Sequence, residues 1–95
     1  MGIIDKEIAE ELREKALGVS ALVLITVVAG TPRELSAGIA GLPGVEKVYE
    51  LTGDIDLVAL VSAVDMDELS TIIFEIRRVR GVVRTDTRTI IGVSP

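Results

Sequence analysis

The chain has 95 residues, a formal net charge of −5 and apolar side chains at 48% of its positions. This length gives one domain with a two-layer core, and the negative charge disfavours nonspecific binding to nucleic acid. Cysteine and histidine are absent, which excludes disulfides, thiolate metal sites and histidine-based catalysis. The N-terminus does not resemble a signal peptide, and no apolar run is long enough to span a membrane. We therefore expect a cytoplasmic protein without a membrane anchor.

Asparagine and glutamine are also absent, whereas isoleucine, valine, glutamate and arginine are frequent. This bias indicates a thermophilic source. Sampling in a short chain is the alternative explanation.

The first predicted element is an amphipathic helix over residues 3–17. Asp5 is its expected N-cap and Gly18 its expected end. Its apolar residues recur at four-residue intervals: Ile4, Ile8, Leu12 and Ala16. A helix of this length is marginal alone in water, so it must dock on its own domain or on another subunit. The sequence leaves both options open.

Four strands and two further helices are predicted after it. The strands at 20–29 and 55–64 are apolar on both faces, as expected of buried strands. The strands at 45–52 and 82–91 alternate more clearly, as at a sheet edge. Strict alternation would place Val45, Lys47, Tyr49 and Leu51 on one face of the former. It would place Val83, Thr85, Thr87, Thr89 and Ile91 on one face of the latter.

The first of these helices begins at Thr31 and Pro32, which form an N-cap and a favourable first position, and Glu34 completes a capping box. Leu35, Ile39 and Leu42 form its inward face. The second follows the N-cap Asp65 and carries apolar residues at helical spacing: Leu69, Ile72, Ile73 and Ile76. A Gly-Val pair follows each helix, at residues 44–45 and 81–82.

This order, strand-helix-strand-strand-helix-strand, predicts an α+β fold of the ferredoxin-like βαββαβ type, with the extra N-terminal helix before it. Two helices cover one face of the antiparallel sheet, and the first and third strands lie in its middle. The other face carries Val, Ile and Leu side chains from those central strands. Because a soluble monomer rarely exposes so large an apolar area, a partner sheet or the opening helix should cover it. We favour a homodimer with its sheets face to face.

Two charged features are candidates for chemistry. Asp54 and Asp56 form a carboxylate pair beside Gly53. Such a pair can bind a cation or act as acid and base, but more often it caps a turn and binds amides or a ligand amine. Five of the ten basic residues fall within 77–88. They indicate either a nucleic-acid stripe or, more readily, ion pairs with acidic residues such as those of the opening helix: Glu7, Glu10, Glu11 and Glu14.

Three elements occur in a specific order: Gly44-Val45, Thr52-Gly53-Asp54-x-Asp56, and Gly81-Val-x-Arg-Thr85-x-Thr87. Together they resemble the effector-binding (RAM) domain of the Lrp/AsnC regulator family over about residues 20–91. Family members commonly have an aromatic residue where this chain has Ile55. We expect residues 1–18 to form the N-terminal helix and residues 19–95 the RAM domain. One acidic helix cannot form a helix-turn-helix, so the chain resembles the stand-alone members.

The resemblance implies a small amino-acid effector, a homodimer, and further assembly of dimers into a ring, which for four dimers is an octamer. It also implies mixed assembly with full-length Lrp/AsnC relatives, and no cofactor, membrane or direct nucleic-acid contact. The implied effector-binding residues come from two places. Thr52, Gly53, Asp54 and Asp56 hold the amino and carboxylate ends of the effector, and Thr85 and Thr87 come from a neighbouring subunit.

Two other classes of function remain to be weighed. A small dimeric α+β-barrel enzyme of the monooxygenase type has the same order of elements, but such enzymes generally show a histidine or a tyrosine-rich cleft. This chain has no histidine and one tyrosine, so we expect no enzymatic activity. A purely structural assembly protein with a vestigial pocket is the other alternative, and ligand binding separates it from a sensor.

Overall fold

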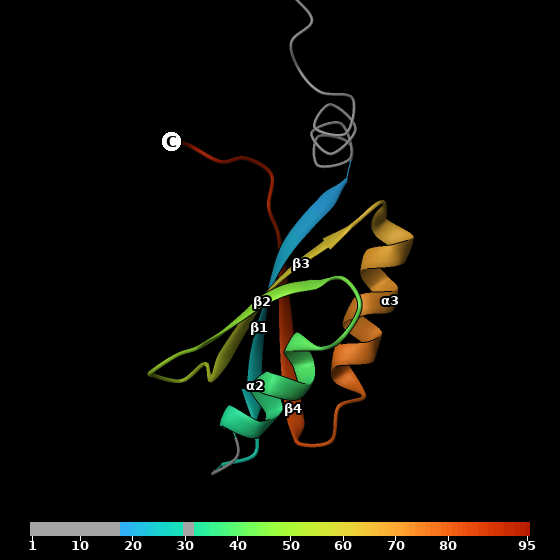
Figure 1. The fold of residues 1–95 in the computed structure, drawn as a ribbon. Helices are drawn as coiled ribbons and strands as arrows, with labels where there is room; N and C mark the ends of the chain where they lie inside the picture. Colours follow the sequence, from blue (N-terminus) through green and yellow to red (C-terminus); the bar gives the residue numbers. More distant parts are fainter. Residues whose placement is uncertain (1–17, 30–31) are drawn as a thin grey trace, which may run out of the picture.

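The computed structural model describes residues 18–29 and 32–95, where the strands and helices follow the predicted order (Figure 1). The predicted helix over 3–17 and the predicted cap Thr31 lie outside the described residues. The strands are β1 (Val19–Val27), β2 (Val45–Glu50), β3 (Leu57–Ala63) and β4 (Val82–Thr89), and the helices are α2 (Pro32–Ala40) and α3 (Met66–Arg77).

All neighbouring strands pair antiparallel, in the order β2-β3-β1-β4. The first and third strands therefore lie in the middle, and the predicted ferredoxin-like fold is confirmed. β3 begins at Leu57, two residues later than expected, because residues 55 and 56 still belong to the preceding connection.

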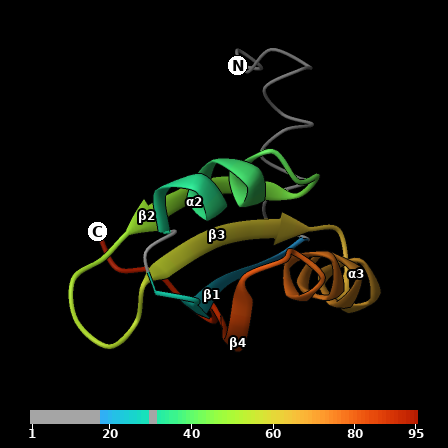
Figure 2. The same ribbon diagram turned by 90° about the horizontal axis from the view of Figure 1, so that it is seen from below.

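The cap predicted for the start of α3 acts as expected. Asp65 caps α3, and its carboxylate accepts a hydrogen bond from the backbone N–H of Glu68 at 2.8 Å. α2 packs mainly on β2, whereas α3 packs on β3 and β4 (Figure 2). Ile39 of α2 and Ile72 and Ile76 of α3 are buried, so each helix contributes its apolar stripe to the core.

The core lies between the helices and one face of the sheet. Alternate residues of the two central strands supply most of it, as the period of a strand requires. The buried apolar residues are Ala21, Val23, Ile25, Val27, Ile39, Leu57, Ala59, Val61, Ala63, Leu69, Ile72 and Ile76.

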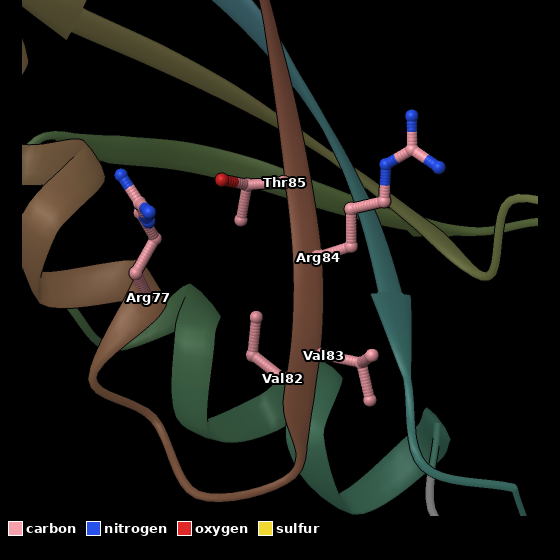
Figure 3. A pocket seen from close by; sticks show the side chains of 5 residues that line it. All are labelled: Arg77, Val82, Val83, Arg84 and Thr85. Carbon is pink, nitrogen blue, oxygen red and sulfur yellow. The ribbon is translucent and has the colours of Figure 1, made fainter.

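Two register shifts correct the faces predicted for the edge strands. Val45 pairs with Val61 on the helix face, but Lys47 pairs with Leu60 on the opposite face, because the register shifts between them. A second shift lies where β4 pairs with the end of β1. As a result, Val83 points to the side of Arg84 and away from Thr85 (Figure 3). Both predictions of strict alternation are therefore wrong, because a bulge places two consecutive side chains on the same side of a strand.

The face of the sheet opposite the helices is called the open face here. Its centre is apolar, with Leu22 and Leu24 of β1 beside Val58 and Leu60 of β3. Leu22 is 37% exposed. Tyr49 of β2, which pairs with Val58 of β3, is 48% exposed. Both described helices lie on the other side, so the structure supports the predicted apolar face that neither of these helices covers. Neither of these helices is long and apolar enough to cross a membrane.

The two Gly-Val pairs have a common structural reason. Gly44 and Gly81 have positive φ angles of 87° and 104°, which glycine adopts without steric cost. A Cβ atom at Gly44 would collide with the side chain of Ile72, and one at Gly81 would lie 2.9 Å from Cδ1 of Leu35. The chain thus enters β2 and β4 through turns that bring the backbone close against a helix or its core residues.

We predict that Gly44→Ala lowers the free energy of unfolding by about 2 kcal/mol or more, because the new methyl group combines backbone strain with a core collision. Gly38→Ala is the matched control. A Cβ at this position in α2 meets no atom within 4 Å, and alanine favours a helix by about 0.5–1 kcal/mol. Urea unfolding of the two variants measures the difference, and equal stabilities would contradict this account of Gly44.

Candidate functional site

The connection between β2 and β3, residues 51–56, holds four of the six predicted site residues. Thr52, Gly53 and Asp54 are exposed there. Gly53 makes the reversal possible with a φ angle of 106°. The backbone N–H of Leu51 donates to the carbonyl of Asp56 at 2.8 Å and closes the connection. In Figure 1 this loop, coloured yellow-green, projects from the sheet on the side away from α3.

Asp56 fixes this connection to the neighbouring strand. Its carboxylate Oδ2 accepts a hydrogen bond from the backbone N–H of Val27 at 2.9 Å. Its own N–H donates to the carbonyl of Ile25 at 3.1 Å. Asp56 is half-buried, and its oxygen satisfies the backbone N–H group of Val27 at the end of β1. Asp56 is therefore a positioning residue for the loop that carries Asp54.

Asp54 borders a cavity of about 350 Å3 beside the open face. The cavity mixes apolar residues with both signs of charge, and neither described helix contributes a lining residue to it. Its other lining residues are Leu24, Thr26, Ile55, Val83, Arg84 and Asp86.

Thr85 and Thr87 lie on the helix face of β4, paired with Ile25 and Val23 of β1. Both are half-buried. Thr85 borders a second cavity, of about 330 Å3, together with Arg77, Val82, Val83 and Arg84. Figure 3 shows the hydroxyl group of Thr85 on the side of β4 where Arg77 lies, whereas Arg84 points to the other side.

Within one chain, neither of these two cavities, both lined by described residues, joins the two parts of the predicted site. Asp54 borders the first cavity and Thr85 the second, and both cavities include Val83 and Arg84. Thr52, Gly53, Asp56 and Thr87 border neither of them. Two arginines, Arg77 and Arg84, border a cavity although the sequence did not place them in the site. The signal was the arginine-rich segment 77–88, whose arginines have different environments.

Two other arginines of that segment form exposed ion pairs. Arg78 lies 3.4 Å from the carboxylate of Glu75, and Arg88 lies 2.8 Å from that of Asp86. The hydrogen bond from Arg88 lowers the pKa of Asp86, and the same bond raises the pKa of Arg88. The predicted ion pairing thus occurs for these two, with partners on α3 and β4. The predicted acidic partners in the opening helix lie outside the described residues.

The described residues contain no group of three or more acidic side chains able to hold a metal ion. Asp54 is exposed and Asp56 is turned to the amide of Val27. A chelating arrangement of this pair is therefore not present in the connection.

Comparison with known proteins assigns most of the chain to one family. Residues 20–93 match the Lrp/AsnC ligand binding domain. The chain is 38% identical to the HTH-type transcriptional regulator LysM of Saccharolobus solfataricus over 90 residues, which is 95% of this chain and 63% of that protein. The chain thus spans less than two thirds of the length of this regulator.

Two further similarities concern a crystal structure and an enzyme. The crystal structure of TTHA0845 from Thermus thermophilus superposes with a TM-score of 0.75 at 38% identity, covering 81% of this chain and 98% of that one. A segment of 50 residues is 44% identical to homocitrate synthase of Sulfurisphaera tokodaii, which is 53% of this chain and 11% of the enzyme.

We predict that Asp56→Ala lowers the free energy of unfolding by about 1–3 kcal/mol, because the half-buried N–H of Val27 loses its acceptor. Asp54→Ala, an exposed change of the same type two residues away, is expected to stay within about 0.5 kcal/mol of the original chain. Chemical unfolding followed by circular dichroism compares them. If Asp56→Ala were as stable as Asp54→Ala, the hydrogen bond to Val27 would not hold the connection.

Proposed function

The chain belongs to the Lrp/AsnC family of ligand-binding domains, and from this premise we propose that it is an amino-acid-sensing regulatory module. Its effector is a small amino acid bound where subunits meet. The observation that carries this proposal is the connection at 51–56, which presents an exposed carboxylate beside a cavity, on a turn held by the hydrogen bond between Val27 and Asp56.

Three residues of this connection have roles in the proposed site. Asp54 is the partner of the effector's ammonium group, because its carboxylate is exposed and borders the cavity. The backbone N–H groups of Gly53 and Asp54 receive the effector's carboxylate. Gly53 suits this role since a side chain at its position would stand in open space that a ligand uses. Asp56 keeps the turn in place through Val27.

Thr85 and Thr87 complete the site from a neighbouring subunit in this proposal. Their hydroxyl groups supply donors and acceptors to the effector. The separation of Asp54 and Thr85 into different cavities of one chain is consistent with a site that forms only on assembly. The effector then couples to assembly, because it binds the assembled form and not the separated subunits.

We propose a homodimer in which two open faces pack together. The apolar centre of this face, around Leu22 and Leu60, is flanked by charged residues of both edge strands, Lys47 on one side and Arg88 on the other. This pattern of an apolar centre and a polar rim is typical of protein–protein interfaces. Further association of dimers into a ring would then bring connection 51–56 to a neighbour.

The readout of such a sensor is regulation of transcription or of metabolism. Similarity to a transcriptional regulator favours the first, and the segment shared with homocitrate synthase favours the second. Both uses require the same event, an effector-dependent change in assembly. Mixed assembly with full-length relatives through the same surfaces would transmit it to DNA.

Isothermal titration calorimetry against the twenty amino acids tests effector binding. We expect at least one to bind, and Asp54→Ala to weaken it about 10- to 100-fold, because a charge-assisted hydrogen bond is lost. Asp67→Ala, an exposed acidic change on α3, is the control and should leave the affinity unchanged. If none of the twenty amino acids binds at millimolar concentration, the proposal is contradicted.

Light scattering tests the interface. Leu22→Glu places a charge in the apolar centre of the open face and is expected to convert dimers into monomers. Met66→Glu is the matched control, since Met66 is 56% exposed at the start of α3, away from the open face. A monomeric original chain, or a Leu22→Glu chain that stays dimeric, would contradict a dimer through this face.

A further inference from the structure

Arg77 and Thr85 come from two different elements and face the same cavity. Arg77 ends α3, and Thr85 lies in β4. Figure 3 shows both side chains on the same side of β4, with the hydroxyl group of Thr85 directed to the space that Arg77 borders. The cavity measures about 330 Å3, which is within the range of sites for small ligands.

The charge of this cavity is opposite to that of the chain. Its five lining residues include two arginines and no acidic residue, although the chain as a whole carries a net charge of −5. The ion pairs of the described residues use Arg78 and Arg88, and neither Arg77 nor Arg84 takes part in them. Among the described residues, no ion pair therefore occupies the guanidinium group of Arg77. A concave positive region on an acidic body attracts anions selectively.

The backbone of β4 adds donors to the same place. β4 is an edge strand of the described sheet, so its outer side has no neighbouring strand there. The N–H of Ile90 donates to Ser20 of β1 at 2.8 Å. Since the direction of backbone groups alternates along a strand, Thr85 and Thr87 direct their N–H groups outward, away from β1. Thr85 itself borders the cavity, so its outward N–H group is a further donor at this edge of the sheet.

We propose that this cavity is a carboxylate subsite and that the effector is a dicarboxylic amino acid of the glutamate or aspartate type. The inference rests on the proposed function, whose site it extends through Thr85. Arg77 binds the side-chain carboxylate through its planar guanidinium group, a geometry that matches a carboxylate bidentately. The hydroxyl and N–H groups of Thr85 bind the same carboxylate, while Arg84, across the strand, adds positive potential.

This arrangement discriminates between amino acids by the charge of their side chains. Glutamine has the shape of glutamate but lacks the charge, so it loses the pairing with Arg77 and is expected to bind about 10-fold more weakly or worse. Lysine brings an ammonium group beside the guanidinium group of Arg77 and is expected to bind least, since like charges repel at short range.

Isothermal titration calorimetry of the full chain with L-glutamate, L-aspartate, L-glutamine and L-lysine tests the proposal. We expect one of the two acidic amino acids to bind best. Arg77→Gln should weaken it about 10-fold or more and reduce its preference over glutamine. Arg33→Gln removes the same charge from an exposed position of α2 outside the cavity. It should leave the affinity for the acidic amino acid and its preference over glutamine unchanged. Arg77→Glu should invert the order, so that lysine binds better than glutamate.

The results separate this inference from the proposed function. If glutamine or another neutral amino acid binds the original chain as tightly as glutamate and aspartate, the carboxylate subsite is wrong while the sensor function stands. The same holds if Arg77→Gln leaves the affinity for the acidic amino acid unchanged. If no amino acid binds the original chain, both are wrong.

Discussion

The pairing of β1 with β3 is the constraint on which the rest of this structure depends. Both strands are apolar on both faces, and seven consecutive residue pairs join them from Val19 and Ala63 to Ile25 and Leu57. One face of this pair packs under the helices and forms the core. The other has apolar side chains but no described helix above it. The same pairing that builds the domain therefore also creates the surface through which we propose that copies associate.

Small departures from regular geometry then decide where functional groups lie. The bulge near the start of β4 turns Val83 to the side of Arg84, and these two residues border both cavities. The hydrogen bond from Val27 to Asp56 holds the connection at 51–56 at the end of β1. The bulge directs Val83 to a side that a regular strand would not give it, and the hydrogen bond fixes where Asp54 is presented.

The electrostatic pattern supports a division of roles among residues of like charge. Arg88 and Arg78 neutralise acidic neighbours on the surface, and such exposed pairs add little stability. Arg77 and Arg84 form no such pair with another described residue and border cavities instead. Likewise Asp56 holds the backbone whereas Asp54 faces a cavity. Function in this domain is thus assigned by local surroundings, since residue type alone is the same within each pair.

The sequence by itself determined the order of elements, the central strands, the cap at Asp65 and the turns at Gly44 and Gly81, because these follow from local periodicity, capping and backbone freedom. It also indicated the connection at 51–56 as a site. Only the tertiary structure decided the faces of the edge strands, the structural role of Asp56 and the cavity at Arg77. These depend on register shifts and on contacts between segments far apart in the chain, which no local pattern records.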